Sequence, residues 1–400
     1  MEPSRKSQTI QANLFCDKTQ GSSPDILGSG KTETVEKPVN WDSVCKVGIC
    51  AMEKKVKSAA MQEMLQSILS HGKNFLKIEV FTPETIFHRQ AEDWPIVDVL
   101  ISFYSVGFPL DKVLKYVELR QPQCVNDIGF QKILLDRRLV FCVLKNIGVS
   151  LPPHIFVNRD SPSKKEELYA CLAQVTWKNS TLEKSMESLQ NALNFNQTGE
   201  TIRVGSHSLR MPFVEKPACA DRHDIYIYYP SSMGGGVRRL FRKTADRSSE
   251  YYNPREDEKC GDVAQVRLDG SYVYEAFLDA DVQQDVKVYC VGPHYAYGES
   301  RKSPVVDGVV ERLPDGKERR FVTTLSSEES KAATAIVSGF RQFVCGFDII
   351  RCKNRFFVID VNGWSFVKGN EEYYREAGKY LATYILFLWS RPNCADILSS

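Results

Sequence analysis

The sequence lacks the features that mark a membrane protein, a secreted protein or a cysteine-rich metal protein. Its most apolar stretch, residues 380–389, is about half as long as a membrane span. The opening residues, MEPSRKSQTI, contain no apolar segment of a secretory signal. The 12 cysteines form no CxxC pairs and keep no regular spacing, so neither a zinc site nor a disulfide framework is indicated. We therefore expect a cytoplasmic protein without a membrane span, in a reducing compartment.

The sequence also lacks a charge excess of either sign. Its 52 Lys and Arg residues are nearly balanced by 50 Asp and Glu residues, which gives a formal net charge of +2. A general nucleic-acid binder needs a basic excess to displace counterions from the phosphate backbone. No nucleic-acid partner is therefore expected, and any site for an anion must be local.

Apolar periodicity divides the chain into a tail, an α/β unit and a second half rich in strands. Residues 1–40 are polar and without periodicity, which predicts a disordered tail. The residues that follow alternate between strand-like runs and amphipathic helical segments: 44–52, 60–69, 75–81, 97–103, 111–119 and 136–146. This alternation predicts an N-terminal α/β subdomain over residues 41–150.

The rest of the chain is predicted to be mainly antiparallel strands. Residues 161–205 are polar and have no clear pattern, so we expect an inserted loop with one short helix. From residue 211, alternating β-branched and aromatic residues predict strands, with helices near 327–343 and 371–390. We expect two lobes, residues 151–285 and 286–395, and an α+β fold class overall.

Oxygen-bearing side chains end two neighbouring strands in the segment FDIIRCKNRFFVIDVNGWSFVK. Asp348 ends the first apolar run, and Asp360 and Asn362 end the next. The two-residue period of a strand places Asp360 and Asn362 on one face. Two carboxylates and an amide oxygen suit Mg²⁺ bound together with nucleotide phosphates. A polar hairpin end with capped turns stays open as the alternative.

Two further segments combine cations with features of phosphate sites. In FVEKP, Lys216 stands among apolar residues at a strand end, where it would reach a phosphate or simply be solvated. His223 follows closely and would donate to the same anion or lie on the surface. In SSMGGGVRRLFRK, three glycines precede Arg242 and Lys243. A glycine run alone is more often a flexible hairpin tip, and the basic residues after it make a phosphate lid an equal alternative.

The segment SYVYEAFLDADVQQDVKVYCVG is predicted to be two strands joined by a linker. Glu275 precedes the linker, and Asp285 and Lys287 follow it. A linker between two lobes is a natural place for an adenine ring, and an ordinary hairpin is the alternative. Basic residues also recur at 54–57, 137–138, 301–302 and 368, where each cluster alone is most often a solvated face.

Taken in order, nine segments resemble the diphosphoinositol pentakisphosphate kinase family in its N-terminal ATP-grasp kinase part: ICAMEKK, LDRR, FVEKP, DIYIYYPSSMGGG, RLFRK, DVKVY, RKSP, CGFDII and DVNGWSFVK. The match runs from Cys45 to Lys379. The resemblance implies an α/β subdomain followed by two β-rich lobes that clamp ATP. It also implies transfer of the γ-phosphate to a phosphate of inositol hexakisphosphate or diphosphoinositol pentakisphosphate, and a phosphatase-like domain after the kinase part in the full-length protein.

The resemblance assigns roles to individual residues. The implied nucleotide contacts are Arg137, Lys216, His223, Arg242, Glu275, Ala276, Phe277, Leu278, Asp285, Lys287, Ser303, Asp348, Asp360 and Asn362, the last three as Mg²⁺ ligands. The implied inositol phosphate contacts are Lys54, Lys55, Arg242, Lys243, Lys287, Arg301, Ser365 and Lys368. Lys287, Arg242 and Asp360 would act on the transferred group. Ala276 departs from the family, in which we expect a second glutamate.

The predicted acceptor, a phosphate oxygen, is largely ionised near neutral pH because the second phosphate pKa is about 6. The reaction therefore needs positioning and charge neutralisation rather than a general base. Two other functions stay open. An ATP-grasp ligase would share the nucleotide site but has no use for so many acceptor-side cations, and a silent inositol phosphate sensor has no need of the metal ligands.

Overall fold

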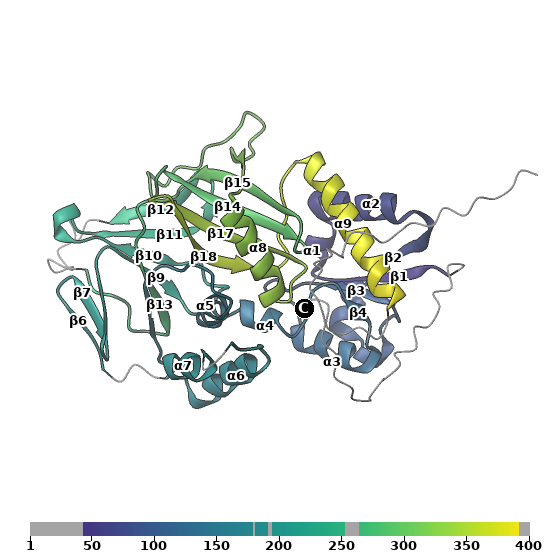
Figure 1. The fold of residues 1–400 in the computed structure, drawn as a ribbon, viewed down its shortest axis with the longest axis horizontal. Helices are drawn as coiled ribbons and strands as arrows, with labels where there is room; N and C mark the ends of the chain where they lie inside the picture. Colours follow the sequence, from purple (N-terminus) through teal and green to yellow (C-terminus); the bar gives the residue numbers. More distant parts are fainter. Residues whose placement is uncertain (1–42, 179–180, 191–193, 253–263, 392–400) are drawn as a thin grey trace, which may run out of the picture. The chain divides into compact units, whose positions relative to one another are not determined.

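A computed structural model describes residues 43–178, 181–190, 194–252 and 264–391 of the chain (Figure 1). The tail predicted for residues 1–40 lies outside these ranges. Within them, none of the helices has both the length and the hydropathy that crossing a membrane requires.

The first part of the chain forms a parallel sheet covered by helices. Its strand order is β2-β1-β3-β4, and the neighbouring strands run parallel. The elements are β1 (Cys45–Cys50), α1 (Glu53–Val56), α2 (Ala59–Gly72), β2 (Leu76–Val80), β3 (Val99–Ser102), α3 (Leu110–Arg120) and β4 (Gln123–Cys124). Ser58 fixes the start of α2, because its side chain accepts a hydrogen bond from the Met61 N–H. The predicted N-terminal α/β arrangement is confirmed.

A six-stranded antiparallel sheet, called sheet D here, forms the first β-rich lobe. Its strand order is β12-β11-β10-β9-β13-β5. The strands are β5 (His154–Val157), β9 (Phe213–Pro217), β10 (Ile225–Tyr228), β11 (Val237–Thr244), β12 (Arg247–Tyr252) and β13 (Tyr272–Ala276). Successive side chains along these strands point to opposite faces of the sheet. One face is buried and contains Phe213, Tyr228 and Tyr274.

A five-stranded antiparallel sheet, called sheet F here, forms the second β-rich lobe. Its strand order is β16-β15-β14-β17-β18. The strands are β14 (Gln284–Val291), β15 (Ala296–Lys302), β16 (Phe321–Thr323), β17 (Val344–Cys352) and β18 (Arg355–Asn362). The helices α4 (Gln131–Leu134), α5 (Arg137–Asn146), α8 (Ser327–Gly339) and α9 (Glu371–Ser390) accompany the sheets.

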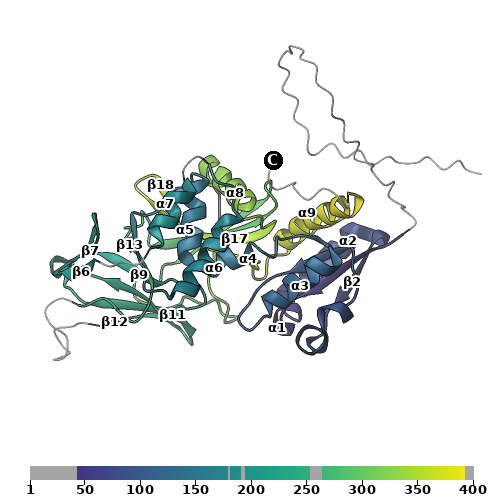
Figure 2. The same ribbon diagram turned by 90° about the horizontal axis from the view of Figure 1, so that it is seen from below.

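Two helices explain how the sheets are held. Nearly every residue of α5 is buried, and its apolar side chains share one core with β13, β14, β17 and α8. Helix α9 lies beside α2, although the two come from opposite ends of the described chain (Figures 1 and 2). Burial of both faces of α5 therefore joins the two lobes, and α9 ties the N-terminal sheet to sheet F through a shared core.

The prediction of an inserted loop at residues 161–205 was wrong in part, because the described residues of this segment form two helices and two strands. It contains α6 (Pro162–Ala173), α7 (Thr181–Ser188), β6 (Phe195–Thr198) and β7 (Thr201–Val204), and β8 (His207–Arg210) completes a three-stranded sheet. Ser161 caps α6, and Leu168 and Leu172 insert into the main core. Because two leucines one turn apart suffice to anchor α6, the apolar periodicity of this helix is weak in the sequence.

Candidate phosphate site

The three predicted metal ligands and Lys287 meet where β14, β17 and β18 lie side by side. Asp348 is paired in register with Lys287 on one side and with Asp360 on the other. Lys287 Nζ lies 3.2 Å from Asp348 Oδ2. Asn362 Nδ2 lies 3.3 Å from Asp348 Oδ2 and 3.5 Å from Asp360 Oδ2. Residues from three strands thus form one cluster of charged and polar groups.

This cluster has the chemistry that a hard cation requires. Asp348 Oδ1 is buried and has no hydrogen-bond partner among the described residues. Burial would raise the pKa of Asp348, but the charges of Lys287 and Arg301 hold it below its ordinary value. An ionised carboxylate with a free buried oxygen is suited to Mg²⁺. Turning the Asn362 amide over would direct its oxygen to the same point.

The predicted metal ligands comprise only two carboxylates, Asp348 and Asp360, together with the amide of Asn362. In the described part of the chain, no three or more His, Cys, Asp and Glu residues are grouped to hold a metal ion. The two aspartates and one amide therefore fit a cation that takes further ligands from phosphate oxygens, as Mg²⁺ does at nucleotide sites.

Lys216 connects the two large sheets. It lies on β9 of sheet D, and its ammonium group is 2.9 Å from Glu275 Oε2 and 2.8 Å from the carbonyl oxygen of Ile359 on β18. Burial raises the pKa of Glu275, although the charge of Lys216 opposes this. A phosphate contacting Lys216 would have to share the ammonium group with this carboxylate.

The predicted adenine linker retains only part of its backbone hydrogen-bonding capacity. The Ala276 N–H donates to the carbonyl oxygen of Pro153, and the Phe277 N–H donates to that of Pro212. These two amides are therefore engaged inside the protein. Leu278 lies after the end of β13, in the linker that leads to β14 of sheet F.

Arg137 holds the segment that leads from Lys216 to His223. Its guanidinium donates to four carbonyl oxygens, which belong to Pro217, Cys219, Ala220 and Arg222. Burial lowers the pKa of His223, and the charges of Arg242 and Arg137 lower it further. The structure therefore brings Arg137, His223 and Arg242 together, but it shows Arg137 occupied by backbone rather than open to a ligand.

The predicted acceptor cations come together from separate elements. Burial lowers the pKa of Lys55 on α1, and the charges of Arg242, Lys54 and Lys368 lower it further. Arg242, Lys243, Arg301 and His223 line a cavity of about 380 Å³. These clusters look like separate solvated faces in the sequence, but they converge in the fold.

Asp285, Ser303 and Ser365 complete the predicted set. Asp285 is paired in register with Arg301 across β14 and β15. Burial raises the pKa of Asp285, although Arg301 and a hydrogen bond with Ser303 oppose this. Ser365 donates its hydroxyl to the carbonyl oxygen of Gly363, directly after the strand that carries Asn362.

The glycine run has a backbone that other residues would strain. Gly234, Gly235 and Gly236 have φ values of 92°, 70° and 84°. At Gly236 a Cβ atom would lie 2.4 Å from Tyr251 Oη, whereas at Gly234 and Gly235 it would meet open space. The first two glycines can therefore approach a ligand closely.

Three charged residues that lie beside the predicted ones were not predicted from the sequence. Glu299 lies opposite Lys287 in register, Arg320 lies 3.0 Å from Glu299, and Glu318 forms an ion pair with Lys243. The run KERR at residues 317–320 was the available signal, because it places a carboxylate beside a cluster of cations. The position of this run beside β15 and the end of β11 depends on the tertiary structure and cannot be predicted from the spacing of residues in the sequence.

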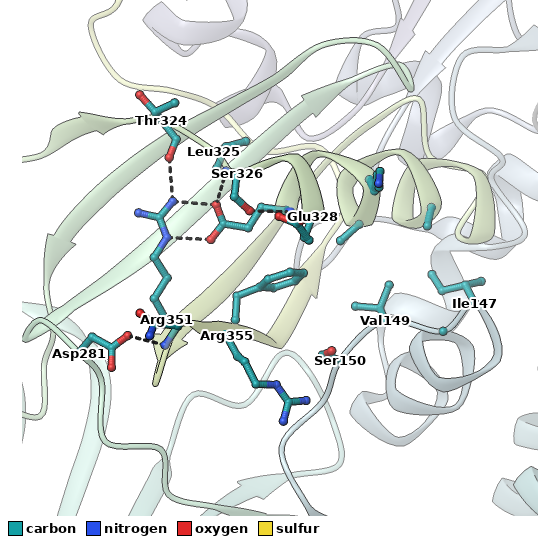
Figure 3. A pocket seen from close by; sticks show the side chains of 17 residues that line it. Ile147, Val149, Ser150, Asp281, Thr324, Leu325, Ser326, Glu328, Arg351 and Arg355 are labelled. Carbon is teal, nitrogen blue, oxygen red and sulfur yellow. Dashed lines mark hydrogen bonds and ion pairs between the residues drawn. The ribbon is translucent and has the colours of Figure 1, made fainter.

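A cavity larger than the basic one lies elsewhere, between α8 and the β17–β18 hairpin. This α8 pocket has a volume of about 880 Å³ and contains none of the predicted site residues. Figure 3 shows Val149, Leu325 and Arg355 among the side chains that line it. Arg351 forms two hydrogen bonds with Glu329, at 2.7 and 2.8 Å, so these two charges of the pocket are already paired.

Comparisons with known proteins agree with the predicted class. Residues 45–136 match the family model described as the diphosphoinositol pentakisphosphate kinase 2 N-terminal domain. The inositol hexakisphosphate and diphosphoinositol-pentakisphosphate kinase of Saccharomyces cerevisiae is 42% identical over 93% of this chain and 31% of that protein. The human kinase 2 of the same description is 41% identical over 85% of this chain and 24% of that protein.

A solved structure of D-alanine–D-alanine ligase from Bacillus anthracis aligns with 87% of this chain and 99% of its own, with 12% identity and a TM-score of 0.46.

The chain has the predicted α+β architecture, with an α/β subdomain followed by two β-rich lobes, which are in contact where Lys216 donates to the carbonyl oxygen of Ile359. Its resemblance to the diphosphoinositol pentakisphosphate kinase family is confirmed. The chain spans less than a third of the length of the curated relatives named above.

Proposed function

We propose that this chain transfers the γ-phosphate of ATP to a phosphate of inositol hexakisphosphate or diphosphoinositol pentakisphosphate, forming inositol pyrophosphates. The observation that carries the proposal is the position of Lys287. It lies in contact with Asp348 on β17 and opposite Glu299 on β15, the strand that also carries Arg301 of the basic cavity. The printed names of the relatives give both acceptors.

The nucleotide side would be formed by both lobes. Lys216 and His223 from sheet D, and Lys287 from sheet F, would contact phosphates of ATP. Asp348, Asp360 and Asn362 would hold Mg²⁺, which when bound neutralises charge on the β- and γ-phosphates. The buried Oδ1 of Asp348, which has no hydrogen-bond partner among the described residues, supports this assignment. The carbonyl groups of residues 275–278 and the amide of Leu278 would contact adenine.

The acceptor side would be formed by Lys54 and Lys55 of α1, Arg242 and Lys243 of β11, and Arg301 of β15, with Ser365 and Lys368 after β18. Their task is electrostatic, because ATP and a polyphosphorylated inositol repel each other strongly. Cations fixed by the fold lower this repulsion without reorganising during the reaction. The shared effect of Arg242, Lys54 and Lys368 on the pKa of Lys55 supports their convergence.

Two other functions are weaker. An ATP-grasp ligase with a carboxylate acceptor gains nothing from so many cations beside the transferred phosphate. A catalytically silent sensor has no need of the Asp348–Asp360–Asn362 cluster, which is complete in this chain. Neither accounts for cations and carboxylates that meet at Lys287.

The test is incubation with ATP, Mg²⁺ and inositol hexakisphosphate, followed by separation of the products by anion exchange. We expect a more highly charged inositol product and an equal amount of ADP. ATP consumption that depends on a carboxylate acceptor would favour the ligase, and tight inositol hexakisphosphate binding without product would favour the sensor. A cytoplasmic location and a following phosphatase-like domain belong to the same proposal.

A further inference from the structure

Glu318 brings a negative charge into the basic acceptor cavity. It lies on a hairpin over residues 311–319, in which Arg312 and Glu318 are bridged and the Arg319 N–H donates to the carbonyl oxygen of Glu311 at 2.8 Å. The hairpin connects β15 of sheet F with β16 and reaches the end of β11 in sheet D. Glu318 is therefore held by backbone pairing beside residues of both lobes.

The carboxylate of Glu318 is shared between two cations. It forms an ion pair with Lys243, and the other oxygen lies 2.9 Å from Arg320 Nη2. Arg320 in turn contacts Glu299 and the hydroxyl of Tyr289, at 3.0 and 2.7 Å. The side chain of Glu318 is 15% exposed and that of Lys243 is 33% exposed, so water screens this pair less than a surface pair.

The surroundings keep Glu318 ionised. Burial would raise the pKa of Glu318, but Lys243, Arg320 and Arg301 hold it below its ordinary value. Burial lowers the pKa of Lys243, and Arg301 adds to this, although Glu318 opposes it. In the free protein the carboxylate therefore offsets the mutual repulsion of the nearby cations.

We propose that Glu318 determines how strongly the acceptor cavity holds a polyanion, because it competes with a ligand phosphate for Lys243. This inference rests on the proposed function, in which Lys243 faces the acceptor. A ligand phosphate that contacts Lys243 must separate or share the Lys243–Glu318 pair, and it also approaches the Glu318 charge. The penalty grows with ligand charge, so Glu318 weakens binding most for the most highly phosphorylated ligands.

The test is Glu318→Gln, with binding measured by calorimetry in the absence of ATP at low ionic strength. We expect inositol hexakisphosphate to bind about three- to tenfold more tightly than to the unchanged protein, and an inositol tetrakisphosphate to gain less than about twofold. Higher salt should reduce both gains, because it screens the repulsion that was removed. The free variant should unfold at a lower temperature, because its ion pair with Lys243 is weakened. Because the variant binds inositol hexakisphosphate more tightly, this ligand should raise its unfolding temperature by more than it raises that of the unchanged protein.

Three controls separate competition from a structural role. Glu318→Asp keeps the charge and should bind like the unchanged protein. Glu92→Gln removes a carboxylate paired with Lys115 outside the site and should change nothing. In a Lys243→Ala background, Glu318→Gln should lose most of its gain, because the contested partner is absent.

Weaker or unchanged binding in the Glu318→Gln variant would overturn the inference, and so would a full gain in the Lys243→Ala background. The proposed function fails in a different way. If the unchanged protein binds inositol hexakisphosphate but makes no product, the kinase proposal is wrong while the comparison of Glu318 variants still stands.

Discussion

The α8 pocket and the candidate phosphate site differ in how their charges are satisfied. The α8 pocket is the larger, at about 880 Å³ against 380 Å³ for the basic cavity. Its buried carboxylate, Glu329, accepts bonds from Arg351 and from the Ser326 N–H, and so completes the cap of α8. In the phosphate site, Asp348 keeps a buried oxygen without a partner among the described residues.

This difference indicates what the two regions do. A buried charge whose bonds are all made inside the protein stabilises the fold and has little left for a ligand. A buried charge with an unmade bond lowers stability unless a ligand completes it. In the proposed function, the unfilled bonding capacity of Asp348 counts for more than cavity size, so variants in the two regions should behave differently.

The largest effect is expected for Asp360→Asn. The change removes one carboxylate charge beside Asp348 and keeps the size of the side chain, so the fold should persist while turnover is nearly abolished. Steady-state rates at saturating Mg²⁺, with circular dichroism as the check on folding, measure this. Near-normal turnover would contradict the assignment of Asp360 as a metal ligand.

A smaller but still large effect is expected for Lys287→Ala. If Lys287 contacts the moving phosphoryl group, removing its preorganised charge should lower kcat by about 10²- to 10³-fold. Binding of ATP and of inositol hexakisphosphate, measured by calorimetry, should persist. Lys287→Arg should recover only part of the rate, because the planar guanidinium does not reproduce a compact ammonium.

If Lys287→Ala keeps its kcat and loses only acceptor affinity, then Lys287 is a binding contact. Arg242 and the carboxylate cluster would then have to support the transfer step.

A moderate effect is expected for Lys54→Ala. Lys54 lies on α1 and would contact a phosphate that does not react. Its loss should raise the KM for the inositol phosphate by roughly tenfold with little change in kcat, since the contact is equal in the ground and transition states. A fall in kcat at unchanged KM would place Lys54 in the chemical step.

The smallest effect on activity is expected in the α8 pocket. Glu329→Gln keeps the side-chain shape but weakens the bonds to Arg351, so it should destabilise the fold by about 1–3 kcal/mol. Turnover per folded molecule should be unchanged. A chemical denaturation curve and an activity assay on the same sample test both statements, and a loss of turnover at full folding would give the α8 pocket a functional role.

The sequence predicted the strands that carry the site because their apolar alternation is strong. The pairing of Asp348 with Asp360 follows from two adjacent strands joined by a short turn, so a local pattern was sufficient. The helices α6 and α7 were not predicted, because only a few buried leucines anchor this segment and they leave a weak apolar pattern in the sequence. The Glu318–Lys243 pair was missed because residues 75 positions apart meet only through the hairpin and the two sheets. Long-range charge pairing leaves no periodic signal in the sequence.

The most direct test of the account follows a labelled phosphate. The protein is incubated with ATP labelled at the γ-phosphate, Mg²⁺ and inositol hexakisphosphate, beside the Asp360→Asn and Glu329→Gln variants. We predict that the label enters a diphosphate group on the inositol ring with the unchanged protein and with Glu329→Gln, and that almost none is transferred by Asp360→Asn. Label found only as free phosphate, or transferred equally by Asp360→Asn, would contradict the account.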